Sequence, residues 1–288
     1  MPKKFSKPHL SRIINGDVVL PSPPEADPKT RLDVALQAKY PQFNRSTIKK
    51  YIKAGQALIN QQSVTKPNTL VADTDQLDLQ LLAPSALPKV PIIFENDDVI
   101  VMDKPAGLLT ISKGDFNPEP TLEVYGQIVH RLDRDTSGVI ILAKNSAAKT
   151  HLQKQFQDRK AHKIYHAVVV GRPKHPAAVI NVPLARNLKQ PTTFQPDPAG
   201  RVAVTAYQTL GTSDKYTLLE LKPTTGRTHQ LRVHLAHIGT PILGDKVYGH
   251  TPASRMFLHA ASLEITLPGG QRQTFTSKTP SEFQDVLK

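Results

Sequence analysis

HRLDRDTSG, residues 130–138, places the carboxylate of Asp133 between Arg131 and Arg134 and leads into the apolar run VIILA at 139–143. The Asp-Thr-Ser-Gly sequence is typical of a turn, and the apolar run after it predicts a buried strand. A carboxylate among guanidinium groups stays ionised at neutral pH, because nearby positive charge favours its charged form. This suits a nucleophile or a base, and arginines suit a substrate that carries negative charge. Ordinary surface turns have similar compositions, so this segment alone does not distinguish a functional site from a surface turn.

The chain is strongly basic. Its 288 residues include 37 Lys and Arg against 24 Asp and Glu, a net charge of +13. The electrostatic field of such a charge favours polyanions as partners, and no apolar run or terminal amphipathic helix suits a membrane. We therefore expect nucleic acid as partner and no membrane contact. We also expect a monomer. The absence of cysteine excludes disulfides and thiolate zinc sites. The N-terminus lacks the apolar core of a secretory signal, so we expect a cytoplasmic protein.

Composition divides the chain into four parts. Residues 1–28, basic and then proline-rich, predict a mostly disordered tail in which 13–20 could pair as a hairpin. Residues 29–82 predict a small domain, 83–91 a proline-rich linker, and 92–288 a single α+β domain. Strands and helices do not alternate strictly in this last part, which argues against a doubly wound parallel sheet.

Hydrophobic spacing predicts the following elements. In the small domain we expect a helix from Leu32 to Tyr40, a helix over 46–54 capped by Asn44 or Ser46, and strands at 57–60 and 76–82. In the large domain we expect strands at 92–94, 99–102, 139–143, 164–170, 202–209, 216–221 and 263–267, and helices at 147–159 and 229–238, the latter capped by Thr228.

The second helix of the small domain carries a row of cations. Arg45, Lys49 and Lys53 are four residues apart and therefore lie one above the other. Stacked cations without an acid among them repel one another unless an anion lies alongside. A solvated face is the alternative, but Lys50 and Arg31 add charge to the same region, so we expect all five to contact an RNA phosphate backbone.

Four more segments accompany the aspartate turn: DKPAG at 103–107, KIY at 163–165, TGRTHQLRVHL at 225–235 and PILGDKVYG at 241–249. Together they resemble the RluA-type pseudouridine synthases over residues 92–288, and residues 29–82 resemble the RNA-binding domain named after ribosomal small-subunit protein four. The resemblance implies an α+β fold, in which a mixed, largely antiparallel central sheet with flanking helices follows a small α+β S-four-like domain. It also implies an isomerase that converts uridine to pseudouridine, in large-subunit ribosomal RNA as first choice and in transfer RNA as second.

The resemblance assigns roles to single residues. Asp133 matches the catalytic aspartate, Tyr165 the tyrosine that stacks on the target base, and Arg232 the arginine that pairs with the carboxylate. Arg131 matches an arginine proposed to fill the gap left by the flipped uridine, and Leu258 matches an apolar wall of the pocket. Two further residues of the matching motifs are expected to contact the substrate: Arg227 and Lys104.

The chemistry of this isomerisation fits those residue types. The bond between ribose and base nitrogen breaks, the base rotates, and a bond to ring carbon forms. A carboxylate can attack the anomeric carbon or remove a ribose proton, and the sequence leaves both open. The target must first leave its helix, at a cost of a few kcal/mol, and an aromatic ring can then hold it by stacking. No redox change or activated group is involved, so we expect no cofactor and no metal.

Other functions fit the residues less well. Asp133 and Asp135 could be a glycosidase pair, but two residues apart in a tight turn they would scarcely straddle a sugar ring. His234 and His237, with His229 nearby, could share a metal, although no carboxylate accompanies them on the helix.

A non-catalytic RNA-binding or ribosome-assembly protein is the alternative from another class. It would have no need for an aspartate among Arg131, Arg134 and Arg232.

The segment between Gly107 and His130 is shorter than in many members of the resembled family, which leaves the identity of the RNA open.

Overall fold

The computed structural model describes residues 12–14, 17–19, 29–41, 43–80, 89–112 and 120–288. They form two compact units, a small unit up to residue 80 and a large unit from residue 89. β1 (Arg12–Ile14) and β2 (Asp17–Val19) pair antiparallel, which confirms the hairpin expected there. The rest of the expected tail, and most of the expected linker, lie outside the described residues. In the part that is described, no helix is both long and apolar enough to cross a membrane.

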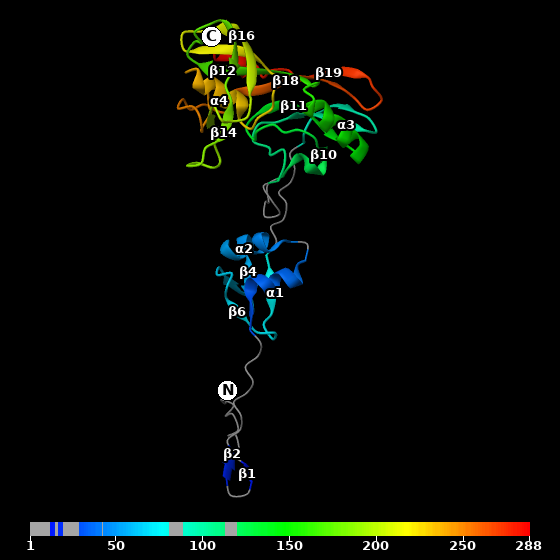
Figure 1. Ribbon diagram of the computed structural model, residues 1–288, viewed down its shortest axis with the longest axis vertical. Helices are drawn as coiled ribbons and strands as arrows, with labels where there is room; N and C mark the ends of the chain where they lie inside the picture. Colours follow the sequence, from blue (N-terminus) through cyan, green and yellow to red (C-terminus); the bar gives the residue numbers. More distant parts are fainter. Residues whose placement is uncertain (1–11, 15–16, 20–28, 42, 81–88, 113–119) are drawn as a thin grey trace. The chain divides into compact units, whose positions relative to one another are not determined.

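The small unit packs two helices on two small sheets (Figure 1). The helices are α1 (Leu32–Lys39) and α2 (Arg45–Lys53), and both confirm the sequence prediction. Asn44 caps α2 by accepting a hydrogen bond from the N–H of Thr47 at 3.0 Å. One sheet has the order β5 (Gln62–Val64), β4 (Ala57–Ile59), β7 (Leu77–Leu79), and the other pairs β3 (Thr30–Arg31) with β6 (Leu70–Val71).

A ten-stranded sheet organises the large unit (Figure 1). Its main path runs β13 (Ala177–Asn181), β16 (Val204–Thr212), β17 (Tyr216–Pro223), β12 (His162–Val170), β18 (Leu258–Thr266), β11 (Ser137–Ala143), β9 (Val99–Lys104), β8 (Ile92–Glu95). β10 (Gln127–Ile128) joins β11, and β19 (Arg272–Thr276) joins β18. Among these described strands, β11 and β18 pair in parallel and the other pairs are antiparallel. The expected mixed, largely antiparallel sheet is therefore confirmed.

Several strands have no signal in the sequence prediction. β13 was missed because it alternates weakly, with Val179 64% exposed. β14 (Leu184–Arg186) and β15 (Phe194–Pro196) form a separate two-stranded hairpin that the apolar pattern does not indicate.

Two predicted strands have different boundaries in the structure. The observed β16 starts later and ends later than the expected strand at 202–209. β18 begins at Leu258, five residues before the strand expected at 263–267.

Helices flank this sheet. α3 (Ser146–Gln157) packs Ala148 and Leu152 into the same core as β11, and α4 (Gln230–His237) packs Leu231 and Leu235 against residues of β12 and β17. A single turn of helix, α5 (Glu282–Asp285), lies near the C-terminus.

The expected Thr228 cap of α4 is wrong. The N-cap residue is His229, in a left-handed conformation with φ 57°, and it makes no side-chain cap hydrogen bond. The side chain of Gln230 instead accepts the N–H of Arg227 at 3.0 Å and the hydroxyl of Thr225 at 2.7 Å. A side chain inside the helix thus accepts hydrogen bonds from residues before it, and the chain turns sharply at His229 as it enters the helix.

Candidate active site

One cavity of the large unit brings together most residues to which roles were assigned. It lies where the loop before β11 approaches the N-terminus of α4, with β12 and β18 beside it. Because β18 pairs with both β11 and β12, segments far apart in sequence meet here. Its walls include six of the seven predicted catalytic and substrate-binding residues: Arg131, Asp133, Tyr165, Arg227, Arg232 and Leu258.

The backbone on both sides of Asp133 is fixed. The hydroxyl of Thr110 donates to the carbonyl of Leu132 at 2.9 Å and accepts its N–H at 3.3 Å. After the turn, Gly138 has φ +110°, and a Cβ there would come within 2.2 Å of the carbonyl oxygen of Ala260. Only glycine lets β11 approach β18 so closely, so this residue sets the position of the loop relative to the sheet.

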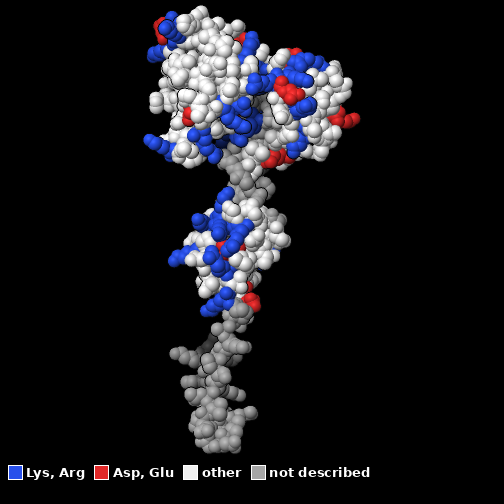
Figure 2. Space-filling view, viewed as in Figure 1, with Lys and Arg blue, Asp and Glu red and all other residues white. Residues whose placement is uncertain are grey.

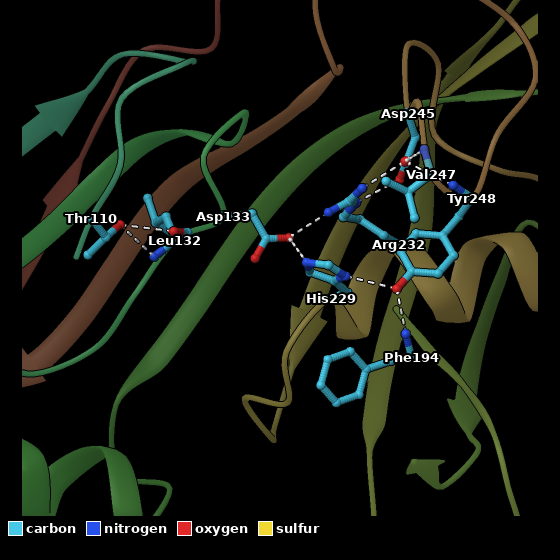
Figure 3. A network of polar contacts seen from close by, with 9 residues as sticks. All are labelled: Thr110, Leu132, Asp133, Phe194, His229, Arg232, Asp245, Val247 and Tyr248. Atoms are coloured by element: carbon cyan, nitrogen blue, oxygen red, sulfur yellow. Dashed lines mark hydrogen bonds and ion pairs between the residues drawn. The ribbon is translucent and has the colours of Figure 1, made fainter. Parts of the chain in front are cut away.

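Arg232 is shared by two carboxylates (Figure 3). Its Nε and Nη2 bind Asp245 at 2.7 and 2.8 Å, and its Nη1 binds Oδ2 of Asp133 at 3.1 Å. Asp245 also accepts the N–H groups of Val247 and Tyr248 at 2.9 and 3.1 Å. Burial raises the pKa of Asp245, but the hydrogen bonds from Arg232 outweigh it and hold that pKa below its ordinary value. The bidentate pair fixes the guanidinium plane and hence the direction from which it reaches Asp133.

His229 approaches the same oxygen of Asp133 as Arg232 does. Its Nε2 is 3.9 Å from Oδ2 of Asp133, and its Nδ1 is 2.8 Å from the hydroxyl of Tyr248. That hydroxyl also accepts the backbone N–H of Phe194 at 2.9 Å, as Figure 3 shows. Burial is the main cause that lowers the pKa of His229, so the imidazole is neutral at pH 7.

The cavity also holds an aromatic side chain and a cation on β12. Tyr165 follows a β-bulge in the pairing with β18, and burial, followed by the charge of Asp133, raises its pKa, so its hydroxyl stays neutral. Lys163 lines the same cavity, and burial lowers its pKa to about 8. Lys163 belongs to the KIY segment at 163–165, but no sequence pattern points to a role for this lysine.

Lys104 does not occupy the place expected of a substrate contact. Its side chain is fully buried, and its ammonium donates to the carbonyls of Pro105, Leu108 and Arg134 at 3.0, 2.8 and 2.9 Å. All three N–H groups are thereby used, and they tie the turn after β9 to the aspartate loop. Lys104 is a structural residue beneath the loop, and that prediction is corrected.

The cation that pairs with Asp133 is not one of its sequence neighbours. Arg134 donates its Nε to the carbonyl of Gly107 at 3.1 Å, and Arg131 is exposed at the cavity wall. The described ion pair of Asp133 with an arginine is formed by Arg232, 99 residues later.

The histidines of α4 do not form a metal site. His234 is buried, and its two ring nitrogens lie 3.0 Å from the hydroxyl of Thr205 and 3.0 Å from the carbonyl of Val182. Over the described ranges, no group of three metal-ligating side chains could hold an ion.

A second charged site lies on the small unit, where Figure 2 shows Lys and Arg side chains gathered on one face. Asp33 of α1 is fully buried and binds the Nε atoms of Arg31 and Arg45, both at 3.0 Å, with Nζ of Lys49 at 3.6 Å. Burial raises the pKa of Asp33, but hydrogen bonds from the two arginines outweigh it and hold the pKa at about 2. Sequence spacing showed the cations but missed this acid. Two more exposed lysines lie on α2: Lys50 and Lys53.

Comparison with known proteins agrees with this geometry. Residues 98–237 match the family model described as RNA pseudouridylate synthase, and residues 30–77 match the S4 domain model. A protein of Aquifex aeolicus described as an uncharacterized RNA pseudouridine synthase is 38% identical, over 78% of each chain. Ribosomal large subunit pseudouridine synthase D of Haemophilus influenzae is 32% identical, over 89% of this chain and 90% of its own.

A solved structure gives the same result for the fold. Human RNA pseudouridylate synthase domain containing 1 superposes with a TM-score of 0.60 and 27% identity, covering 68% of this chain and 86% of its own. The loop of Asp133, the strand of Tyr165 and the helix of Arg232 all lie within the matched residues 98–237. The chain therefore belongs to the RNA pseudouridylate synthase family, as an isomerase with an N-terminal S4 domain.

Proposed function

We propose that this enzyme converts uridines of large-subunit ribosomal RNA to pseudouridine, with Asp133 as the catalytic carboxylate. The observation that carries the proposal is the Asp133–Arg232 ion pair of 3.1 Å at the wall of a cavity also lined by Tyr165 and Leu258. Ribosomal RNA is supported by relatives named ribosomal large subunit pseudouridine synthase D, such as the Haemophilus influenzae protein. An enzyme with this substrate would work in the cytoplasm.

In the proposed reaction, a flipped uridine enters the cavity between Tyr165 and Leu258. Arg131, exposed at the wall, fills the gap that the base leaves in the RNA. Asp133 then attacks the anomeric carbon or removes the neighbouring ribose proton, and the N1–C1′ bond breaks. The base turns and the C5–C1′ bond forms, while the bond from Asp133 to C1′ breaks in the first route or the ribose proton returns to C2′ in the second. C5 then loses its proton and N1 gains one. There is no net oxidation or reduction.

The detached uracil carries negative charge at this stage, which must be stabilised in place. Lys163 is a half-buried cation in the same cavity, so its ammonium can take this part together with Arg227. A cation held inside a low-dielectric wall acts more strongly on such an anion than one in water.

The small unit serves as the anchor for the RNA backbone. Arg31, Arg45 and Lys49 surround one carboxylate, which leaves a surplus of two positive charges. Their side chains are 43–48% exposed, so their remaining N–H groups can reach phosphate oxygens. Lys50 and Lys53 extend the same surface.

Mapping pseudouridines across total RNA, from cells with and without this protein, tests the proposal. We expect pseudouridines in large-subunit ribosomal RNA to disappear with the protein and to return with the wild-type gene, but not with Asp133→Asn. Loss of pseudouridine in transfer RNA alone would show that transfer RNA is the substrate, with the proposed chemistry unchanged. Unchanged pseudouridine in every RNA would contradict the proposed function.

A further inference from the structure

Two donors approach the same oxygen of Asp133. Nη1 of Arg232 is 3.1 Å from Oδ2 and Nε2 of His229 is 3.9 Å from it, whereas no described residue is placed against Oδ1 by a hydrogen bond or ion pair (Figure 3). The carboxylate is 17% exposed, at the wall of the cavity. Its two oxygens are therefore unequal before any substrate binds.

The hydroxyl of Tyr248 favours one tautomer of His229. A backbone N–H can only donate, so the hydroxyl oxygen uses one lone pair for Phe194 at 2.9 Å. Its own proton is then available for Nδ1 of His229 at 2.8 Å, which leaves the imidazole proton on Nε2. The opposite tautomer would point a lone pair of Nε2 at the carboxylate and is disfavoured by repulsion.

Burial, more than the surrounding charges, favours the neutral form of His229. Burial lowers its pKa most. The carboxylates of Asp133 and Asp245 act in the opposite direction, while Arg232 and Arg131 lower it further. The neutral ring can donate a hydrogen bond to Asp133 without cancelling its negative charge, whereas an imidazolium would cancel it. A carboxylate that acts as nucleophile or base must keep that charge.

The backbone holds His229 in an uncommon conformation to achieve this position. Its φ of 57° and ψ of 16° are left-handed, which is uncommon for residues other than glycine, although Asn, Asp and His adopt it more often than the rest. The ring is fixed by edge contacts with Phe194 and Tyr248, with centroids 5.8 and 5.6 Å apart. Such strain is kept where the surrounding structure enforces it, and it clusters at functional sites.

We propose that His229 is a positioning residue for Asp133: its Nε2–H and Nη1 of Arg232 together hold Oδ2, so that Oδ1 is the oxygen that reacts with the ribose. The inference rests on the proposed role of Asp133. The separation of 3.9 Å closes to hydrogen-bond length when substrate fills the cavity, as catalytic hydrogen bonds often do. Phe194 begins β15, so the β14–β15 hairpin supports the ring through Tyr248.

Two substitutions of similar size separate this role from a purely structural one. In His229→Gln the amide nitrogen can reach the position of Nε2, whereas in His229→Asn it reaches only that of Nδ1. Asn tolerates the left-handed backbone better than Gln, so we expect His229→Asn to have the higher Tm. We expect the reverse order in activity: kcat falls less than about 5-fold in His229→Gln and about 10²-fold in His229→Asn, with KM unchanged in both.

The assay measures tritium release from total RNA labelled with [5-³H]uridine and extracted from cells that lack this protein, because the reaction expels the C5 hydrogen. His237→Gln, an exposed histidine on the same helix, is the matched control and should behave as wild type. If activity follows the order of Tm, or both variants lose the same activity, the inference is overturned. If the wild-type enzyme itself releases no tritium, the proposed function fails and the inference fails with it.

A double-mutant cycle tests the part of Tyr248. In the structure, Cζ of Arg232 lies 5.0 Å from the centroid of the Tyr248 ring. Tyr248→Phe keeps this ring and removes only the hydroxyl. We expect kcat to fall several-fold in the wild-type background and not to fall further in the His229→Gln background, because the hydroxyl acts through the imidazole. Equal effects in both backgrounds would overturn the inference.

Discussion

The two units of this protein contain ion-pair clusters with opposite ratios of cations to carboxylates. In the small unit one carboxylate, Asp33, is shared by three cations, and in the large unit one guanidinium, that of Arg232, is shared by two carboxylates. The cations around Asp33 are 43–48% exposed, while the side chain of Arg232 is 9% exposed. The first cluster presents surplus positive charge to solvent. The second keeps surplus negative charge at the wall of a cavity.

The difference shows what each arrangement can do. Exposed surplus cations attract a polyanion over a distance, and that attraction weakens with salt. A buried surplus carboxylate is held in one orientation by its shared partner and is poorly screened, which suits chemistry on a single atom.

Removal of the proposed reacting carboxylate should have the largest effect. Asp133→Asn keeps the size of the side chain and a contact to Arg232 but removes the anion, so turnover should fall by about 10⁴-fold or more. RNA affinity should stay within about 2-fold, because the proposed anchor for the RNA lies in the small unit. Tritium release and filter binding measure the two quantities. Asp135→Asn, exposed in the same turn, is the control; turnover close to wild type in Asp133→Asn would remove that residue from its role.

Removal of the second carboxylate should have the next largest effect. Asp245→Asn breaks the bidentate pair with Arg232 while leaving a buried guanidinium, which costs roughly 3 kcal/mol of unfolding free energy. Turnover should fall about 10²-fold, since Arg232 no longer approaches Asp133 from a fixed direction. Denaturant unfolding and single-turnover assays measure both effects. Unchanged turnover would mean that the shared arginine is not needed for chemistry.

Removal of surplus cations from the small unit should weaken RNA binding without changing the chemical step. For Arg45→Ala with Lys49→Ala, we expect the slope of log affinity against log salt to decrease by about 1.5, as for two lost phosphate contacts. Single-turnover rates at saturating enzyme should be unchanged.

The matched control removes the same charge from lysines that pair with other acids: Lys39→Ala with Lys288→Ala. It should leave the salt dependence as in wild type. An equal change in both double variants would show that net charge, and not the Asp33 cluster, governs binding.

The smallest expected effect is a pH dependence at Lys163. Its pKa is about 8, so the ammonium is present below that pH and is lost as the pH rises through it. Turnover should therefore fall several-fold between about pH 7 and 9, while Tyr165 stays neutral because its pKa is raised. Lys163→Arg keeps its charge at all these pH values and should remove the fall. A decline that persists in Lys163→Arg would assign it to another group.

Local features of the sequence predicted much of the fold. The helix over Arg45–Lys53 and its Asn44 cap follow from spacing and capping preference, which depend on neighbouring residues. The aspartate turn and the strand after it were also evident, because turn residues precede a continuous apolar run. In contrast, β13 and the β14–β15 hairpin depend on pairing with distant segments and have weak patterns of their own.

The candidate site was only partly accessible to sequence reasoning. Its motifs identified Asp133 and Arg232, but the sharing of Arg232 with Asp245 depends on how the chain returns after α4. Likewise, Asp33 lies 12 residues before Arg45, on another helix, so no spacing rule within α2 reveals it. Lys104 was misassigned because a lysine in a motif suggests contact with substrate, whereas three carbonyl partners inside the fold satisfy it here.

A crystal structure of Asp133→Asn bound to an RNA fragment that contains its target uridine would test the central claim most directly, because the variant leaves the substrate intact. The account predicts that the uridine lies flipped in the cavity, stacked on Tyr165, with its C1′ facing the side chain of residue 133 and with Arg232 still bound to Asp245. A uridine bound away from this cavity, or one whose C1′ faces away from residue 133, would contradict it.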